Sequence, residues 1–378
     1  MLAGIEFAIG DNRLDYTKAT TIRVPEENRF SKQVLDFNLD EPMELDELGD
    51  RGIVYIERRG AIKLYEYETE QTIVLDSINV HYHAEDGLIG VAVDPNFQTN
   101  QWLYFFYSPD IEEATQYVSR FTLKEDQLTD EKILLKIPLI RQCCHSGGSL
   151  EFGKDGLLYI GIGDNTNPFE SSGYAPIDER ENRQLYDAQR SAANTNDLRG
   201  KILRIRPEAD GTYSIPEGNL FPEGTEKCRP EIYVMGCRNP FRFSIDSKNN
   251  YVYWGDVGPD AGANDSLRGP AGMGEFNQAR EAGFYGWPYS RGNHQMYFDY
   301  DFEKSQSKEI FDPNSIINNS PNNTGIQKLP PIQASMIWFS YKASKEFPWL
   351  GKGGVNPCLL YTSPSPRDAT LSRMPSSA

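Results

Sequence analysis

Basic residues are scarce in this sequence of 378 residues, where 38 Lys and Arg stand against 55 Asp and Glu. The net charge of −17 argues against sequence-independent binding to nucleic acid or to an anionic membrane, because both require a positive surface. We therefore predict no nucleic-acid partner. A solvated acidic surface is the simplest explanation of the charge.

Long apolar runs, export signals and paired cysteines are also absent. No stretch of eighteen or more apolar residues occurs, so we predict no membrane span. The opening MLAGIEFAIGDNR lacks a basic segment followed by an apolar one, so no signal peptide is visible. The five cysteines form no CxxC pair, which argues against a structural zinc site.

The last twenty-one residues, CLLYTSPSPRDATLSRMPSSA (358–378), differ in composition from everything before them. They have no apolar periodicity, and a Ser/Pro-rich segment of this kind is typical of disorder. Their back-translation resembles the end of a transposase sequencing adapter, so we exclude them from fold reasoning. We expect the genuine protein to occupy residues 1–357 as a fragment truncated at both ends.

Hairpins recur along the chain, each with an apolar strand, a turn rich in Asp, Gly and Asn, and an aromatic strand. Their second strands carry marker tyrosines, spaced by 49, 55 and 94 residues: Tyr55, Tyr104, Tyr159 and Tyr253. The last spacing is close to two periods, and 201–218 supplies a plausible hairpin in that gap. A period near fifty is typical of a β-propeller, whereas the strands of a two-sheet sandwich come at shorter intervals.

Long helical patterns are missing. Only Ile177–Ala193 has helix-like spacing, and we interpret it as an inserted loop.

Three hairpins place polar residues at one offset. In each hairpin a polar residue stands eight positions before the first residue of the turn. Asp86 precedes the turn at Asp94, His145 the turn at Gly153, and Arg238 the turn at Asp246. Equivalent positions of propeller blades surround the same end of the channel, so these side chains should meet at one mouth. An antiparallel hairpin returns to the face it left, so 163–165 and 255–259 should open there too.

The chemistry of these residues indicates a catalytic or binding site. A neutral imidazole at His145 suits general-base work on a hydroxyl, and the glycines beside it leave room for a flat ligand. Arg238 with Asn239 suits a carboxylate or a developing oxyanion. The backbone carbonyls of Gly258 and Pro259 could hold a hard cation such as calcium. Each residue also has a purely structural interpretation. His81, His83 and His294 have no such context, and we interpret them as surface residues.

Several ordered motifs carry a family resemblance, among them EDGLIGVAVDPNFQTNQWLYFFYS, HSGGSLEFGKDGLLYIGIGDN, LRGKILRIRP, GCRNPFRFSID, GDVGPDAG and GFYGWPY. They resemble the soluble quinoprotein glucose/sorbosone dehydrogenases, and more closely bacterial sugar-dehydrogenase-like members that are often fused to cytochrome c. The resemblance covers about 42–288 and extends more weakly to 357. It implies an all-β, six-bladed propeller of four-stranded antiparallel blades, here with the last blade missing.

The resemblance also implies a cofactor, pyrroloquinoline quinone (PQQ), and a calcium ion. His145 matches the general base, while Arg238 and Asn239 match the pair against the cofactor. Gly258 and Pro259 match the carbonyl ligands of calcium. Glu85 stands where the glucose enzymes carry a glutamine near the cofactor, and we expect both Glu85 and its neighbour Asp86 to bind the cofactor. The implied reaction is oxidation of a sugar or polyol hydroxyl by hydride transfer to PQQ.

The sequence departs from the family in three ways. Cys144 stands where the glucose enzymes have an acid beside the histidine, and GGS replaces the SGR type of continuation. The family's further basic residues, which neutralise the cofactor's carboxylates, come from a later blade and have no equivalent here. We therefore expect weakened cofactor binding and an inactive fragment of an active parent.

Family members are usually exported, so the resemblance implies a periplasmic or secreted parent, with cytochrome c as a candidate electron acceptor. A disulfide is then compatible with the compartment. The pairing among Cys143, Cys144, Cys228 and Cys237 stays open at this point.

Two alternatives remain. The propeller could be a non-catalytic binding module, because fold alone does not grant activity. It could also be a calcium-dependent lactonase-type hydrolase, for which carboxylates and an amide are available at Asp86, Asp164, Asn165 and Asp256.

Overall fold

The computed structural model describes residues 31, 33–141, 143–340 and 344–347. The predicted foreign tail at 358–378 lies outside these residues. Contacts within the chain separate residues 1–37 from a second unit, 38–378, and all elements below belong to the second unit. Within the described part, no helix has the length and apolar character needed to cross a bilayer.

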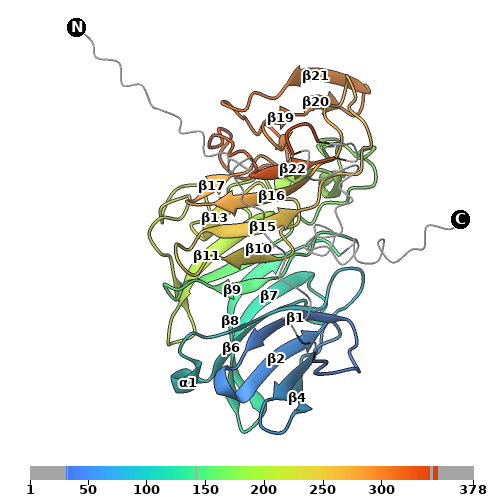
Figure 1. Cartoon of the computed structure of the whole chain (residues 1–378). Helices are drawn as coiled ribbons and strands as arrows, with labels where there is room; N and C mark the ends of the chain where they lie inside the picture. The colour runs from blue at the N-terminus through green and yellow to red at the C-terminus, as the bar shows by residue number, and fades with distance from the viewer. Residues whose placement is uncertain (1–30, 32, 142, 341–343, 348–378) are drawn as a thin grey trace, which may run out of the picture. The chain divides into compact units, whose positions relative to one another are not determined.

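Two four-stranded antiparallel sheets come first along the chain (Figure 1). The first contains β1 (Pro42–Glu47), β2 (Gly52–Glu57), β3 (Ala61–Glu66) and β4 (Gln71–Ser77). The second contains β5 (Leu88–Val93), β6 (Trp102–Tyr107), β7 (Thr115–Lys124) and β8 (Gln127–Pro138), with the short helix α1 (Phe97–Asn100) between β5 and β6. In both sheets the spatial order equals the chain order, as in a propeller blade.

The third sheet has the order β17-β13-β11-β10-β9, and β12 pairs with β11. Its strands are β9 (Leu150–Phe152), β10 (Leu158–Ile162), β11 (Lys201–Pro207), β12 (Tyr213–Ser214), β13 (Ile232–Met235) and β17 (Gly283–Phe284). The fourth sheet contains β14 (Phe243–Ile245), β15 (Val252–Asp256), β16 (Gly274–Ala279) and β22 (Ile337–Phe339). Two further hairpins are β18 (Ser290–Arg291) with β19 (Gln295–Met296) and β20 (Phe298–Asp301) with β21 (Gln306–Ile310).

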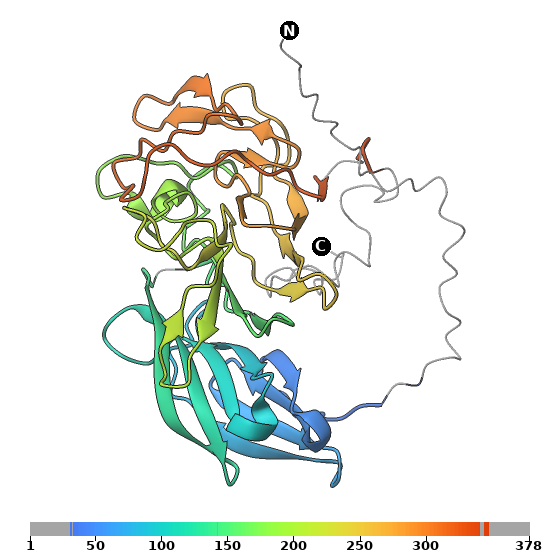
Figure 2. The same ribbon diagram turned by 90° about the vertical axis from the view of Figure 1, so that its left-hand side faces the viewer.

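The four predicted hairpins are confirmed as β1–β2, β5–β6, β9–β10 and β14–β15. Their marker tyrosines all lie on second strands, and Tyr104 and Tyr159 are fully buried in the aromatic core. The first strands of successive sheets contact one another, β1 with β5, β5 with β9 and β9 with β14. Figure 2 shows the same succession as the colour runs from blue to orange. The arrangement is therefore all-β and propeller-like.

The prediction of an additional blade between Tyr159 and Tyr253 is wrong. The hairpin within 201–218 forms as β11–β12, but β11 pairs directly with β10, where Tyr159 stands opposite Arg204. One sheet thus fills a gap that looked like two periods, because the long insertion between β10 and β11 lengthens a single blade. The described residues form four blade-like sheets, so the predicted count of six is not confirmed.

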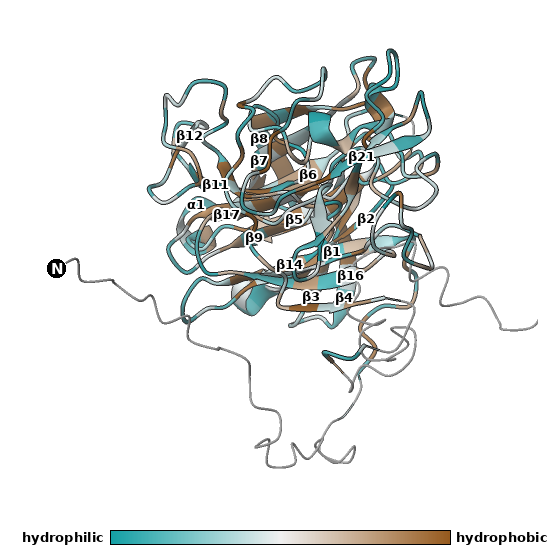
Figure 3. Ribbon diagram, turned by 90° about the horizontal axis from the view of Figure 1, so that it is seen from above, coloured by the Kyte–Doolittle hydropathy of each residue, from teal (hydrophilic) through white to brown (hydrophobic). Residues whose placement is uncertain are grey.

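The insertion between β10 and β11 contains Ile177–Ala193. This segment is mostly irregular, with two short 3-10 helices, Gln184–Tyr186 and Ala188–Arg190. The prediction of an inserted loop is confirmed. Much of the loop is buried, since Ala188, Ala192 and Ala193 have no exposed surface. Figure 3 shows hydrophobic colour mainly along the strands and hydrophilic colour in many of the connecting loops.

Carboxylates join the first strands of neighbouring sheets. Glu44 on β1 accepts hydrogen bonds from the Val91 amide on β5 at 3.0 Å and from the Ser149 hydroxyl before β9 at 2.6 Å. Glu151 on β9 accepts one from the Ile245 amide on β14 at 2.9 Å. These first strands share no backbone ladder, so side chains supply the polar links between sheets.

Arg242, just before β14, connects three of these strands. It donates to the Met43 carbonyl on β1 at 2.8 Å and to the Ile89 carbonyl on β5 at 3.1 Å. Its Nε lies 3.5 Å from a carboxylate oxygen of Glu44. Burial lowers the pKa of the Arg242 guanidinium, and the negative charge of Glu44 opposes that effect.

Candidate active site

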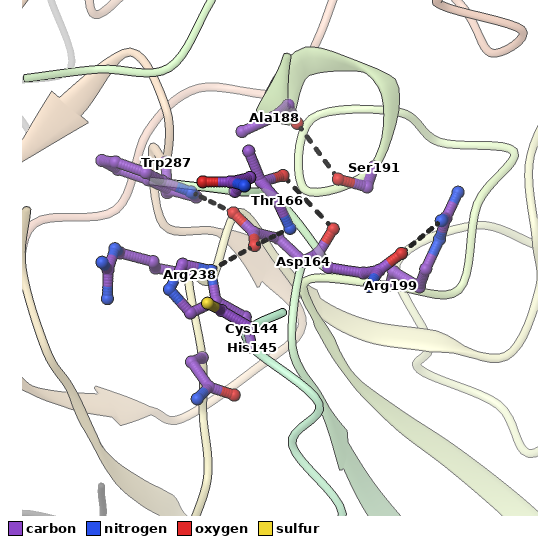
Figure 4. A network of polar contacts seen from close by, with 12 residues as sticks. Cys144, His145, Asp164, Thr166, Ala188, Ser191, Arg199, Arg238 and Trp287 are labelled. Atoms are coloured by element: carbon purple, nitrogen blue, oxygen red, sulfur yellow. Dashed lines mark hydrogen bonds and ion pairs between the residues drawn. The ribbon is translucent and has the colours of Figure 1, made fainter. Parts of the chain in front are cut away.

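The three residues predicted at one offset lie in the segments that lead into β5, β9 and β14. Asp86, His145 and Arg238 are all buried. The Ser146 hydroxyl donates to Asp86 at 3.3 Å, and the amide of Asp164, the partner of His145, donates to the Arg238 carbonyl at 2.9 Å. The structure therefore brings the three positions into one polar network, part of which is drawn in Figure 4.

The backbone of His145 has a left-handed conformation, with φ of 63°. A non-glycine residue with a positive φ needs support from its surroundings. Glu85 supplies it, because one of its oxygens accepts the His145 amide at 2.6 Å and the Ser146 amide at 3.2 Å. Glu85 thus lies beside the predicted base and helps to hold its backbone.

The ring of His145 is fixed by Asp164, which follows β10. Nδ1 of His145 lies 2.7 Å from Oδ1 of Asp164, and Oδ2 of Asp164 accepts a hydrogen bond from Nε1 of Trp287 at 2.7 Å. Burial alone would raise the pKa of Asp164. The charge of His145, the hydrogen bonds from His145 and Trp287, and the charge of Arg238 outweigh burial and lower it.

This pairing decides which imidazole nitrogen carries the proton. An ionised Asp164 can only accept hydrogen bonds, so Nδ1 of His145 must be the donor. Nε2 of neutral His145 is then the basic nitrogen, and none of the described residues is its hydrogen-bond partner. A buried imidazole with a fixed tautomer can remove a proton from a bound hydroxyl.

Arg238 and Asn239 are oriented by Asp256, at the end of β15. Its two oxygens accept the amides of Arg238 and Asn239, each at 2.8 Å. Nη1 of Arg238 donates to the Val257 carbonyl at 3.2 Å. In the described part of the chain, the buried Nε of Arg238 and Oδ1 of Asn239 have no hydrogen-bond partner.

Gly163 explains why these groups can approach so closely. A Cβ at Gly163 would lie 2.0 Å from the His145 carbonyl oxygen and 2.6 Å from Oδ1 of Asn239. Only glycine fits between the base and the amide.

Asp86 already has several partners. It accepts hydrogen bonds from Ser108 at 3.1 Å and from Ser146, and lies 3.7 Å from Nε of Arg141. Burial raises the pKa of Asp86, while Ser108, His81, Arg141 and Ser146 oppose the effect. These contacts fit a residue that supports the loops, and its role in cofactor binding stays a prediction.

Gly258 and Pro259, the predicted calcium ligands, are buried directly after Val257. The Pro259 carbonyl oxygen packs on Gly272, where a Cβ would lie only 1.5 Å away. The described residues contain no group of three or more His, Cys, Asp or Glu side chains that could hold a metal ion. The role of Gly258 and Pro259 as calcium ligands stays a prediction.

The cysteine pairing that the sequence left open is settled between neighbours in the chain. Cys143 and Cys144 form a disulfide directly before His145. Cys228 and Cys237 are free and buried, and burial raises the pKa of the Cys237 thiol. Cys144, at the position where the resemblance implies an acid, is therefore part of a disulfide.

The sequence alone did not show that Asp164 and Trp287 orient the imidazole of His145. The signals were the GDN segment after β10 and the GFYGWPY motif, which carry these residues to His145. His81 was placed on the surface, but it is half-buried, with Nε2 3.9 Å from Asp86. His83 and His294 are exposed, as predicted.

Comparisons with known proteins agree on one family. The sequence profile described as glucose/sorbosone dehydrogenase matches residues 39–329. Aldose sugar dehydrogenase YliI of Escherichia coli is 25% identical over 263 residues, covering 68% of this chain and 61% of YliI. Quinoprotein glucose dehydrogenase B of Acinetobacter calcoaceticus is 26% identical over 354 residues, covering 88% of this chain and 65% of that protein.

Human Hedgehog-interacting protein is also related, with 26% identity over 261 residues, covering 62% of this chain and 35% of its own length. In all three relatives the match spans less than two thirds of the relative.

Solved structures give the same fold. An oxidoreductase of Thermus thermophilus, described as a glucose dehydrogenase, has a TM-score of 0.53 and 27% identity, covering 69% of this chain and 68% of that one. The PQQ-bound aldose sugar dehydrogenase of Streptomyces coelicolor has a TM-score of 0.54 and 19% identity, covering 82% and 72%. At that identity the second likeness concerns the fold alone.

Proposed function

The chain belongs to the glucose/sorbosone dehydrogenase family, and from this we propose that its intact protein is a PQQ-dependent sugar dehydrogenase that oxidises a hydroxyl-bearing carbon of an aldose or polyol. The observation that carries the proposal is the buried His145–Asp164 pair, linked through the Asp164 amide to Arg238, whose Nε has no partner among the described residues. Relatives named aldose sugar dehydrogenase and quinoprotein glucose dehydrogenase support it.

The residues at the site fit PQQ in their chemistry. Buried polar atoms normally have hydrogen-bond partners, so the unpartnered Nε of Arg238 and Oδ1 of Asn239 favour a polar ligand here. Arg238 would pair with a carboxylate or carbonyl oxygen of the quinone, and Asn239 would lie beside it. When bound, PQQ would supply the two-electron acceptor for the hydride.

The chain's own residues would perform the proton transfer. Asp164 holds Nδ1 of His145 protonated, so Nε2 can take the hydroxyl proton of the sugar as the C–H bond breaks. Asp164 also stabilises the imidazolium that forms, and Trp287 keeps the carboxylate in position. Gly163 allows His145 and Asn239 to lie close together, because it has no side chain between them.

Calcium stays in the proposal as a separate expectation. Two carbonyl oxygens, from Gly258 and Pro259, are few for an ion that takes six to eight oxygen ligands. One of them packs on Gly272. We therefore derive no step through calcium. Titration of the metal-free protein with Ca²⁺ tests this expectation, and we expect a gain in thermal stability.

The decisive experiment is reconstitution of the intact protein with PQQ, followed by addition of an aldose panel. We expect quinone absorbance that bleaches with sugar, and loss of bleaching in His145→Gln with PQQ affinity retained. His294→Gln is the matched control, because His294 is exposed. Absence of bleaching by any sugar in protein that binds PQQ would contradict the proposal.

A non-catalytic binding module remains the second candidate, because one relative is named Hedgehog-interacting protein. This candidate predicts that His145→Gln changes little. The lactonase alternative is disfavoured, because Asp86, Asp164 and Asp256 each have separate partners rather than a shared cation cage.

For the intact protein we keep three further expectations: a six-bladed ring, a periplasmic or secreted location, and cytochrome c as a candidate electron acceptor. They rest on the family resemblance. Reduction of cytochrome c by the sugar-treated holoenzyme tests the last.

A further inference from the structure

The disulfide between Cys143 and Cys144 joins consecutive residues, with Cα atoms 3.7 Å apart, and the next residue is His145. A bridge between neighbours closes a ring that contains the peptide bond joining them. The ring restricts rotation about the backbone bonds on either side of this peptide unit. Cys144 is buried and Cys143 is half-buried, and Figure 4 draws Cys144 directly beside His145.

Described residues on both sides of the disulfide are held by contacts. Before the disulfide, Arg141 donates to the Pro109 carbonyl at 2.8 Å and to the Ile111 carbonyl at 2.9 Å. After it, Glu85 binds the amides of His145 and Ser146. The disulfide lies between these anchored ends, so it limits the backbone rotation that would carry the His145 ring away from Asp164.

The left-handed backbone of His145 needs support from its surroundings, and Glu85 supplies part of it. Residues with a side chain avoid this region unless their surroundings impose it, and relaxation of φ would swing the imidazole out of line with Asp164. Glu85 accepts the N–H of the peptide unit between Cys144 and His145 and so fixes that unit. The disulfide ring constrains the unit before it, between Cys143 and Cys144.

We propose that the Cys143–Cys144 disulfide is a positioning element for His145, and that its reduction loosens the His145–Asp164 pair and slows proton removal. The kinetic part rests on the proposed function, whereas the structural part does not. The base would then depend on the oxidised state of its neighbours, so a thiol reductant would act as a negative effector.

Reduction has a defined chemical balance. A phosphine such as TCEP cleaves the S–S bond, the two sulfurs gain two electrons and two protons, and with one water the phosphine becomes its oxide. Two cysteine thiols result. The half-buried Cys143 gives the reductant access, and alkylation with iodoacetamide followed by mass spectrometry counts the thiols formed.

The structural test uses histidine signals in the full chain. With only four histidines, ¹⁵N-histidine labelling gives a spectrum in which His145→Gln assigns the signal of His145. We expect TCEP to move the His145 ring signals and to abolish the hydrogen-bonded Nδ1 proton, while His83 and His294 stay unchanged. The double variant C143S/C144S should resemble reduced wild type, and TCEP should have no effect on it.

The kinetic test uses the intact protein, after TCEP is removed and the thiols are alkylated, so that reductant cannot react with PQQ. We expect kcat for the best aldose to fall at least about tenfold, with altered pH dependence, while KM and PQQ affinity change less than about twofold. If wild type has no turnover but its His145 signals respond to TCEP, the proposed function fails and the positioning role stands.

Identical His145 signals in the oxidised and the fully reduced protein would overturn the positioning role. A melting temperature measured on both forms shows whether reduction has unfolded the chain. If the double variant does not fold, the comparison of oxidised with reduced wild type decides alone.

Discussion

Oδ1 of Asp164 lies 2.7 Å from Nδ1 of His145, and both side chains are buried. The lowered pKa of Asp164 keeps the carboxylate ionised, so it fixes the tautomer of the imidazole. A replacement that keeps the shape but removes the charge should therefore damage catalysis more than folding.

For Asp164→Asn we expect kcat for the best aldose to fall by a factor of about 100 or more, because an amide can donate to Nδ1 and leave the proton on Nε2. Stopped-flow bleaching of bound quinone measures the chemical step. Asn167→Asp in the same loop is a control that changes charge away from the pair. Activity within about threefold of wild type in Asp164→Asn would show that the tautomer is not fixed in this way.

Gly163→Ala should disrupt the site, because its Cβ would meet the His145 carbonyl oxygen at 2.0 Å and Oδ1 of Asn239 at 2.6 Å. We expect loss of PQQ binding, measured by quinone fluorescence or absorbance titration. Gly262→Ala is the matched control, since nothing lies within 4 Å of a Cβ there. Equal PQQ affinity in the two variants would contradict the predicted role of Gly163.

Glu151 should make stability depend on pH. Burial raises its pKa to about 7, with a further contribution from Glu44 and Asp46, although the Ile245 amide lowers it. The folded state therefore binds more protons than the unfolded state between about pH 4.5 and 7, and the free energy of unfolding falls as pH rises across this window.

Glu151→Gln removes that dependence. The variant should match wild type near pH 4.5 and exceed its unfolding free energy by about 2 kcal/mol above pH 7, where wild type carries the partly buried charge. Urea unfolding at several pH values measures the difference. The exposed Glu223→Gln should give a pH-independent offset, and a constant offset in Glu151→Gln as well would contradict the prediction.

Arg242→Met should lower the free energy of unfolding by about 2 kcal/mol, because it leaves the half-buried Glu44 without its cation and removes two hydrogen bonds to backbone carbonyls. Thermal or urea unfolding is the measurement. Arg206→Met, at an exposed position on β11, is the control. Similar losses in both variants would show that Arg242 does not connect the sheets.

Local patterns in the sequence were sufficient for the hairpins and for the meeting of Asp86, His145 and Arg238. Alternating strands, turn residues and one shared offset carry that information. The assignment of β11–β12 to a separate blade failed, because hairpin formation is local whereas the pairing of β11 with β10 spans a long insertion. Trp287 could not be placed either, since it reaches Asp164 from a distant segment.

The carboxylates on β1 and β9 have a consequence for how such a set of sheets could be inherited. Backbone hydrogen bonds hold each sheet together, and acidic side chains on β1 and β9 tie the first sheet to the second and the third to the fourth. A duplicated or transplanted sheet would therefore need both such an acid and the Arg242 contacts to keep the polar links seen between these sheets.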